Sequence, residues 1–206
     1  AEKTEHIITF ADSIEEATKW ATVKFIWLAR IAGGFSPEKE FLSNNKAKEL
    51  LNLLNGELKN EKVVVWFRFN SELEFIREFL MKNKRDCVKI TGEDSLEERK
   101  EASKIFKETK TRIMLAQVAC GKYGLNWSCA STAIYYSNSY AGEDRAQSED
   151  RILDVGRKEP LLYIDLITKG TIDESVVRVL REKYINSRVF MTSLVKDWLK
   201  NAKIKN

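Results

Sequence analysis

Short apolar runs alternate with amphipathic stretches along most of the chain, from Lys62 onward. A continuously apolar run between polar residues is typical of a strand that is buried on both faces. Such runs predict strands at residues 63–67, 87–90, 112–116, 132–136 and 161–167. The stretches between them repeat apolar residues at the helical period and predict helices at residues 71–82, 95–107, 143–153 and 173–184.

Strands that alternate with helices in this way indicate an α/β protein with a doubly wound parallel sheet, covered by helices on both faces. Two further helices are predicted before the sheet. One runs from residue 13 to residue 30 and ends at Gly33 and Gly34, and the other covers residues 44–55, with Gly56 just past its end. In such sheets ligands bind outside the carboxyl ends of the strands, so the loops after the strands are where a site is expected.

The composition is that of an ordinary globular protein, because 43% of the 206 residues are hydrophobic and 32% are charged. This length suggests one domain with an extension, or two small domains. The three cysteines, Cys87, Cys120 and Cys129, are odd in number and lack CxxC spacing, and His6 is the one histidine of the sequence. They argue against a disulfide framework or a zinc site. No apolar run approaches the ~18 residues of a membrane span and no signal-peptide pattern opens the chain. We therefore expect a cytoplasmic protein without a metal site of its own and without a membrane partner.

The net charge is +4, and the basic excess lies at the carboxyl end. Residues 183–206 contain six basic residues against Asp197, which gives this segment +5 and leaves −1 for the rest of the chain. Apolar residues recur there on one helical stripe that starts at Met191 and includes Trp198, so residues 186–206 are predicted to form a basic amphipathic tail helix. A basic end can serve nucleic acid, and a solvated helix face is the alternative.

The sequence contains no self-contained catalytic motif. Gly121 and Lys122 suggest a phosphate-binding loop, but that motif needs Gly where the chain has Ala116 and Ser or Thr where it has Tyr123. There is no GxGxxG after a strand and no GxSxG, and a single histidine makes a Ser/His/Asp triad improbable.

What the sequence does contain is an ordered series of segments: KVVVWFRFNSELEFIREFL from Lys62, ITGEDSLEERKEASKIF from Ile90, QVACGKYGLNW from Gln117, RAQSEDRILDVGRKEP from Arg145 and ITKGTIDESV from Ile167. In this order they resemble the second RecA-like domain of superfamily-two helicases and translocases. The resemblance is closest to Swi/Snf-type ATPases, in particular the compact versions encoded by bacteriophages and bacteria, and it covers about residues 45–183.

The resemblance implies nucleic-acid contacts in three of the loops. They involve Arg68, Asn70, Thr91, Gly92, Lys122, Gly124 and Asn126. Gly124 can take a positive φ or let the backbone approach a ligand closely, and Asn126 can donate and accept hydrogen bonds. For each residue the alternative is a turn or capping role with no ligand.

The resemblance also implies that residues 145–160 face ATP held by another domain. Gln147 and Asp150 would contact the nucleotide, and Arg151, on the same helix face as Gln147, would act as the arginine finger. The family usually carries a second Arg three residues after the first, but this chain has Asp154 there. Either Arg157 supplies the second charge or hydrolysis is weak, since an Asp near phosphate is repulsive.

The expected organisation follows from where this series begins. Residues 1–44 are expected to be a helical lead-in from a missing first motor domain, residues 45–185 a RecA-like helicase C-terminal domain, and residues 186–206 the tail helix. The chain is expected to be one half of an ATP-dependent DNA motor, in the cytoplasm of a host if a phage encodes it. It would use ATP and Mg²⁺ only together with the missing N-terminal RecA-like domain, on DNA that we expect to be double-stranded. The alternatives are a stand-alone nucleic-acid-binding or annealing module without ATPase activity, and a protein-interaction domain that docks through its tail.

Overall fold

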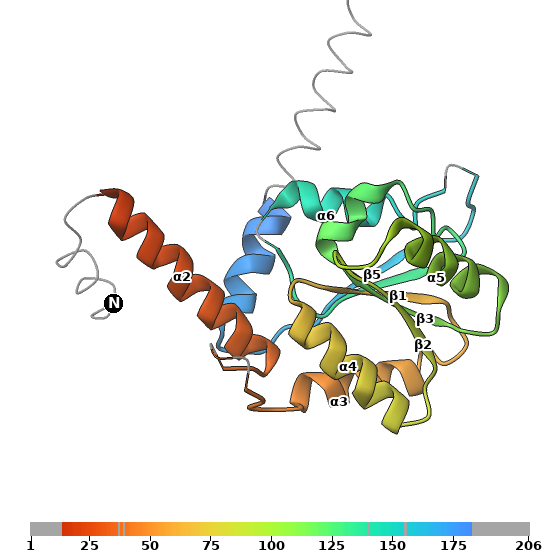
Figure 1. The fold of residues 1–206 in the computed structure, drawn as a ribbon, viewed down its shortest axis with the longest axis horizontal. Coiled ribbons are helices and arrows are strands. Elements are labelled where there is room, and N and C mark those ends of the chain that lie inside the picture. Colours follow the sequence, from red (N-terminus) through yellow and green to blue (C-terminus); the bar gives the residue numbers. More distant parts are fainter. Residues whose placement is uncertain (1–13, 37, 39, 140, 155, 183–206) are drawn as a thin grey trace, which may run out of the picture.

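The structure is a computed structural model that describes residues 14–36, 38, 40–139, 141–154 and 156–182. The expected tail helix over residues 186–206 and the first part of the lead-in lie outside the described residues. Its elements are arranged around one central sheet, as Figure 1 shows.

Five strands form an all-parallel sheet in the order β2-β3-β1-β4-β5. They are β1 (Val63–Phe67), β2 (Cys87–Ile90), β3 (Ile113–Gln117), β4 (Thr132–Tyr135) and β5 (Leu162–Asp165). In the central register Val63 lies opposite both Ile113 and Thr132. All of β1 is buried, as its uninterrupted apolar run requires. The predicted doubly wound parallel sheet is confirmed.

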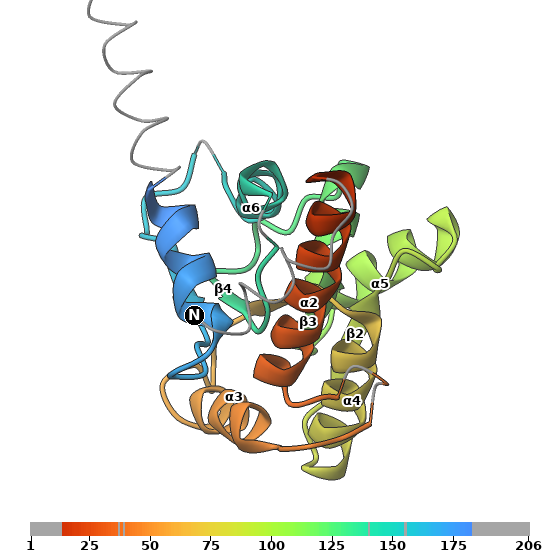
Figure 2. The same cartoon turned by 90° about the vertical axis from the view of Figure 1, so that its left-hand side faces the viewer.

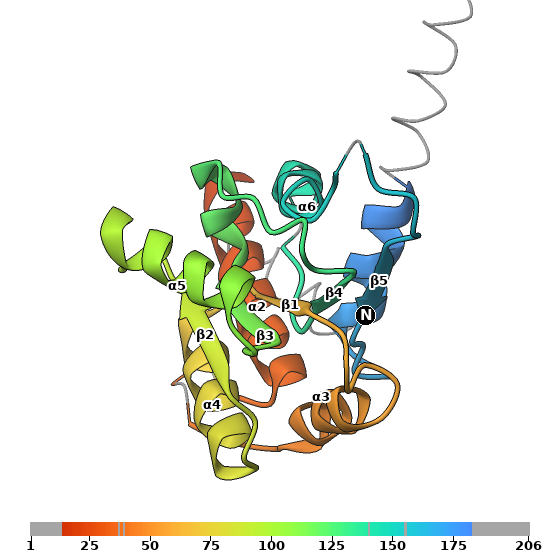
Figure 3. The same ribbon diagram turned by 90° about the vertical axis from the view of Figure 1, so that its right-hand side faces the viewer.

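Helices cover both faces of this sheet (Figure 3). They are α3 (Asn45–Asn55), α4 (Asn70–Lys82), α5 (Leu96–Glu108) and α6 (Gly142–Glu149), with a short 3-10 helix η1 (Val118–Tyr123) and a further helix over residues 172–182. The core has two parts, one on each face. Leu50 of α3 and Ile76 of α4 pack with Val65 on one face, while Phe106 of α5 packs with Trp66 on the other.

The helix expected over residues 143–153 is shorter than predicted, because α6 ends at Glu149. After it the backbone tightens into turns, in which the N–H of Arg151 donates to Ser148 O at 3.3 Å and that of Ile152 to Glu149 O at 3.2 Å. The carbonyl of Arg151 accepts from Trp127 N at 2.7 Å instead of continuing the helix. This bond to a distant loop, which sequence periodicity does not reveal, holds the turn that follows the helix.

Helix α2 (Ile14–Gly33) precedes the sheet and extends away from it (Figures 1 and 2). Its last carbonyls are bound by residues from the carboxyl edge of the sheet. The hydroxyl of Tyr136 donates to Gly33 O at 3.1 Å, and that of Thr168 donates to Ala32 O at 2.8 Å. The C-terminal end of α2 is therefore fixed to the sheet.

Candidate nucleic-acid and nucleotide interfaces

The loops that follow β1, β2 and β3 lie at one edge of the sheet, because the carboxyl ends of parallel strands point the same way. Hydrogen bonds connect these loops to one another. Asn70, after β1, donates through Nδ2 to Glu93 Oε1 in the next loop at 3.0 Å. Gly92 N, after β2, donates to Oε1 of Gln117 at the end of β3 at 3.0 Å. The fold thus places Asn70 and Gly92 in neighbouring loops that are joined by hydrogen bonds.

Arg68 and Thr91 both have intramolecular contacts in this edge. The backbone N–H of Arg68 donates to Ser137 Oγ at 2.8 Å, and its guanidinium carbon lies 5.1 Å from the centre of the Phe69 ring and 5.7 Å from that of Phe25 on α2. Thr91 is only 3% exposed, and its N–H and hydroxyl both donate to Asp94 Oδ2. Thr91 therefore shapes the loop, while Gly92 beside it is exposed.

The loop after η1 is open at Gly124. Gly124 has φ +65°, and a Cβ built there would have no atom within 4 Å. Glycine is thus favoured by the left-handed backbone and not by a neighbour inside the protein. Asn126 is exposed, and its Oδ1 accepts from Ser128 N at 2.8 Å. The side chain of Lys122 lies outside the described residues.

The two arginines predicted to be catalytic both bind the loop that contains Gly124 and Asn126. Arg151, just past the end of α6, donates through Nη1 to Leu125 O at 3.2 Å and through Nε to the backbone carbonyl of Gln147 at 3.1 Å. Arg157 donates through Nη1 to Ala130 O at 2.7 Å and through Nη2 to Ser128 O at 3.0 Å. The expected nucleotide-facing segment and the expected nucleic-acid loop are therefore directly connected.

Gln147 and Asp150, the two residues expected to contact the nucleotide, differ in their exposure. Oε1 of Gln147 is buried and has no hydrogen-bond partner among the described residues. A buried amide oxygen without a partner costs ~1–3 kcal/mol. Asp150 is exposed at the end of α6.

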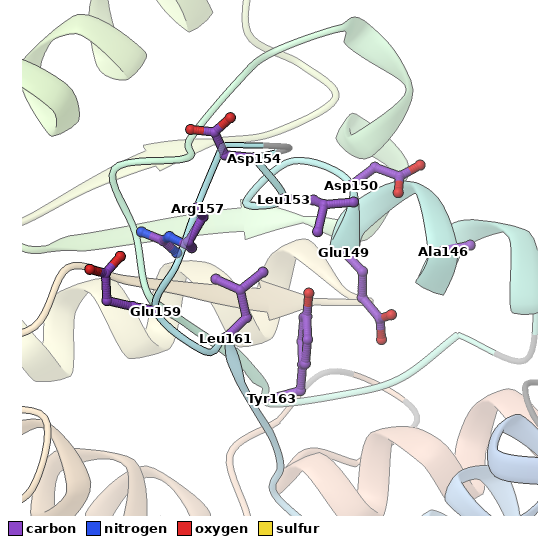
Figure 4. Close-up of a pocket in the computed structure, with 9 residues that line it drawn as sticks. All are labelled: Ala146, Glu149, Asp150, Leu153, Asp154, Arg157, Glu159, Leu161 and Tyr163. Carbon is purple, nitrogen blue, oxygen red and sulfur yellow. The ribbon is translucent and has the colours of Figure 1, made fainter.

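Asp150 borders a pocket of about 510 Å³ that Figure 4 shows. Four carboxylates line it, those of Glu149, Asp150, Asp154 and Glu159, against the single cation of Arg157. Phosphate groups would be repelled by such a lining. The position of Asp150 in this lining therefore argues against a direct contact of its carboxylate with the nucleotide phosphates.

Two residues that the sequence analysis did not single out are central to this edge. Arg145 of α6 binds Glu149 and Asp165 at 2.6 Å each, and its guanidinium lies 3.4 Å from the centre of the Tyr135 ring. Its four-residue spacing from Glu149 was the available sequence signal. Glu72, in the first turn of α4, is fully buried beside Gly33 and accepts from the hydroxyl of Ser137. Burial raises the pKa of Glu72 to about 7.

No group of three or more His, Cys, Asp or Glu side chains that could hold a metal ion occurs among residues whose placement is described. Likewise, none of the described helices is long and apolar enough to cross a membrane.

Comparisons with known proteins identify the family. The model of the helicase conserved C-terminal domain matches residues 45–156. The ATP-dependent helicase fft1 of Schizosaccharomyces pombe is 27% identical over 146 residues, which are 70% of this chain and 16% of that protein. The chromatin-remodeling ATPase INO80 of Mycosarcoma maydis is 28% identical over 137 residues, 65% of this chain and 7% of that protein. The chain thus spans a small part of these relatives.

A solved structure gives the same result. The crystal structure of the C-terminal part of the Fun30 ATPase domain superposes with a TM-score of 0.61 at 25% identity, over 70% of this chain and 50% of that one. The family match covers more than half of the residues and coincides with the ordered loops described above. The chain therefore belongs to the helicase conserved C-terminal domain family, as a C-terminal helicase domain of the Swi/Snf type.

Proposed function

We propose that this chain is the second motor domain of an ATP-dependent helicase or translocase that acts on double-stranded DNA. Residues 45–185 form the motor domain, residues 1–44 lead into it from a first RecA-like domain, and residues 186–206 form its basic tail. The observation that carries the proposal is the connection of the Gly124 loop to Arg151 through the Leu125 carbonyl. A movement of Arg151 on nucleotide binding would therefore displace the loop that is expected to contact DNA.

The residues of this chain fit one side of a nucleotide site. The sequence has no phosphate-binding loop, so the phosphates and Mg²⁺ would be held by the first motor domain. ATP supplies the phosphoryl group whose transfer drives the motor. Arg151 would place positive charge where negative charge develops on that group, a role worth about 10³–10⁵ in rate in related enzymes. Gln147, four residues before Arg151, would contact the same nucleotide.

The residues expected to contact DNA lie in the loops at the carboxyl edge of the sheet. Gly92, Gly124 and Asn126 are exposed at the carboxyl edge and present backbone groups that a phosphate can approach. Arg68 and Asn70 border the same surface. Contacts of this kind hold the DNA backbone without reading its sequence, as a motor that moves along DNA requires.

The finger is tested in the full-length ATPase. Arg151→Ala is expected to lower kcat by about 10²-fold or more with little change in ATP affinity, because the lost interaction is made in the transition state. Arg151→Lys keeps the charge but loses the planar donor geometry, and should restore only part of the rate. Lys158→Ala, an exposed residue nearby, is the matched control. An unchanged kcat in Arg151→Ala would favour the alternative, a nucleic-acid-binding or annealing module without ATPase activity.

The full-length ATPase also tests the effect of Asp154, which stands where the family usually carries a second Arg. Asp154 is exposed and accepts from Gly156 N at 3.2 Å. If Asp154 weakens a functional finger, Asp154→Arg should accelerate hydrolysis. An unchanged rate would instead assign the second charge to Arg157.

The DNA grip is tested at Gly124. Gly124→Val is expected to weaken duplex binding by about tenfold, because a β-branched residue at φ +65° distorts the loop. Gly170 has φ +74° and is also free of atoms within 4 Å of a Cβ, so Gly170→Val is the matched control for backbone strain. Equal losses of DNA binding in both folded variants would contradict a specific role for the Gly124 loop.

A further inference from the structure

A cationic surface lies at the opposite edge of the sheet from the loops that follow β1, β2 and β3, which we call the motif loops. Three turns meet there, at the amino ends of the adjacent strands β2, β3 and β1. They line a pocket of about 230 Å³, which we call the amino-edge pocket. Its charged residues are Lys59, Lys84, Arg85, Lys110 and Arg112, together with Asp86.

The lining of the amino-edge pocket carries an excess of positive charge. Five cations face one carboxylate in the amino-edge pocket, and none of the five forms an ion pair within the described part of the chain. Three helices, α3, α4 and α5, end at this edge, and each helix end contributes about −0.5 of an elementary charge. These ends offset less than half of the excess positive charge. Like charges held this close repel one another, and a bound polyanion would relieve that repulsion.

The α5 end is already occupied by a different cation. Lys62, which is not part of the amino-edge pocket, donates through Nζ to the carbonyls of Phe106, Lys107, Thr109 and Thr111. Capping of this helix therefore does not account for Lys110 and Arg112.

The two guanidinium groups are held in place by backbone carbonyls. Arg85 donates through Nη2 to Leu54 O at 2.6 Å, and Arg112 donates through Nη1 to Asn60 O. Each guanidinium has five N–H donors, so most of the donors remain for a ligand. A fixed guanidinium matches phosphate oxygens in pairs and loses little entropy when it binds.

The backbone at Lys84 also positions a cation. Helix α4 ends with Lys84 N donating to Met81 O at 3.0 Å and Arg85 N donating to Leu80 O at 2.9 Å, the Schellman arrangement. Its left-handed position is usually glycine, but here it is Lys84 at φ 57°. A side chain there costs ~1 kcal/mol relative to glycine. The lysine at this position lies at the end of α4, next to Arg85 in the lining of the amino-edge pocket.

The residues that line the amino-edge pocket favour backbone phosphate groups over a whole nucleotide. The amino-edge pocket has no aromatic residue for a base to stack on, and it is small. It suits phosphate groups along a backbone better than a whole nucleotide. Strand β1 separates this edge from the motif loops by five residues, or ~17 Å. A phosphate here therefore belongs to a different stretch of nucleic acid from the one at the carboxyl edge.

We propose that the amino-edge pocket binds the phosphodiester backbone of nucleic acid as a second contact, independent of the loops at the carboxyl edge. It extends the proposed function, which assigns DNA to the carboxyl edge alone.

The test measures binding of the full chain to a mixed-sequence DNA duplex at several salt concentrations, by fluorescence anisotropy. The test variant carries Lys59→Gln, Lys84→Gln and Lys110→Gln, and so keeps both arginines that bind backbone carbonyls. The slope of log K against log salt should become shallower by up to about 2.7, since each phosphate contact contributes ~0.9. The affinity at low salt should fall about tenfold or more.

The matched control removes the same charge elsewhere. Lys48→Gln, Lys104→Gln and Lys158→Gln alter three exposed lysines outside the pocket, and their combination should leave the slope nearly unchanged. Equal losses in the two triple variants would show a general charge effect and overturn the proposal. An unchanged slope in a folded test variant would overturn it as well.

Two further measurements separate the outcomes. If the edges are independent, the losses in binding free energy from Gly124→Val and from the test variant should add, whereas strong non-additivity would indicate one shared site. Inorganic phosphate is titrated while the amide signals of residues 84 and 110 are followed by NMR. Saturation by free phosphate without any response to duplex would assign the pocket to a small anion and overturn the proposal. The Arg151→Ala experiment does not depend on any of these results, so failure here leaves the motor assignment to its own test.

Discussion

At the scale of single residues, Glu72 is a carboxyl group whose pKa the fold raises well above its usual value. It is fully buried, Ser137 donates to its Oε2, and its Oε1 has no hydrogen-bond partner among the described residues. Burial raises its pKa from 4.5 to about 7, and the Ser137 hydroxyl and Lys46 oppose part of that rise. A Cβ on Gly33 would lie 1.9 Å from Oε1, so this position of α2 has to be glycine for the carboxyl to fit.

The raised pKa predicts a pH-dependent stability. Between pH 4.5 and about 7 the unfolded chain releases the Glu72 proton while the folded chain keeps it, so the free energy of unfolding falls as pH rises through this window. Above pH 7 the free energy of unfolding is lower by about 3 kcal/mol than below pH 4.5, where Glu72 is protonated in both the folded and the unfolded chain. Glu72→Gln should remove this dependence and stabilise the protein at pH 8. Urea unfolding at several pH values measures it, with the exposed Glu78→Gln of the same helix as control. A wild-type curve that stays parallel to that of Glu72→Gln would contradict the prediction.

Glu72 could not be identified from the sequence as a buried group, and the reason is physical. A carboxylate in the first turn of a helix is common and usually solvated, where it favours the helix dipole. Only the contact of α2 with the carboxyl edge, more than 30 residues away in the chain, buries it. By contrast, Gly124 was predictable, because the requirement for a positive φ is local to its turn.

At the scale of elements, the boundaries that depend on local signals were predicted well. Helix α5 begins where the sequence indicates, because Ser95 and Glu98 form a capping box: Glu98 N donates to Ser95 Oγ at 3.2 Å and Ser95 N to Glu98 Oε2 at 2.7 Å. The bond from Ser95 N lowers the pKa of Glu98. Helix α6 was predicted too long because the residues after Glu149 form turns, and one of these turns is held by the long-range bond from Trp127 N to Arg151 O.

The cap makes a prediction about α5. Ser95→Ala should destabilise the protein by ~1 kcal/mol, because one N–H of the first turn loses its acceptor. Ser95→Asp keeps an acceptor at the same place and should recover most of the loss. Thermal unfolding measures the difference. Ser71→Ala, in the first turn of α4 but not at its N-cap, is the control and should cost less. Equal stability of Ser95→Ala and wild type would show that the box does not contribute in solution.

At the scale of the whole molecule, the sequence predicted the sheet because it depends on short runs of residues, but it did not predict the two charged surfaces. The acidic pocket at Glu149 and Asp154 and the amino-edge pocket each collect side chains from separate turns. Their residues are spread over the sequence among many other charges, so no spacing distinguishes them. Only the strand order, which places three turns side by side, reveals that Lys84 and Lys110 share a site.

The last prediction concerns what the chain can do alone. It has no phosphate-binding loop, and its candidate finger Arg151 already donates to Leu125 O and Gln147 O. Because the sequence lacks a phosphate-binding loop to hold the phosphates of ATP, the isolated chain should show no DNA-stimulated ATPase activity. It should still bind duplex DNA, with an affinity that falls steeply with salt. Phosphate release with and without DNA, measured on the purified chain and on the full-length ATPase, makes the comparison. Activity that repeated purification removes would come from a contaminant. Activity that persists through repeated purification and survives in Arg151→Ala would come from a site elsewhere in the chain, and would overturn the assignment of this chain as half of a motor.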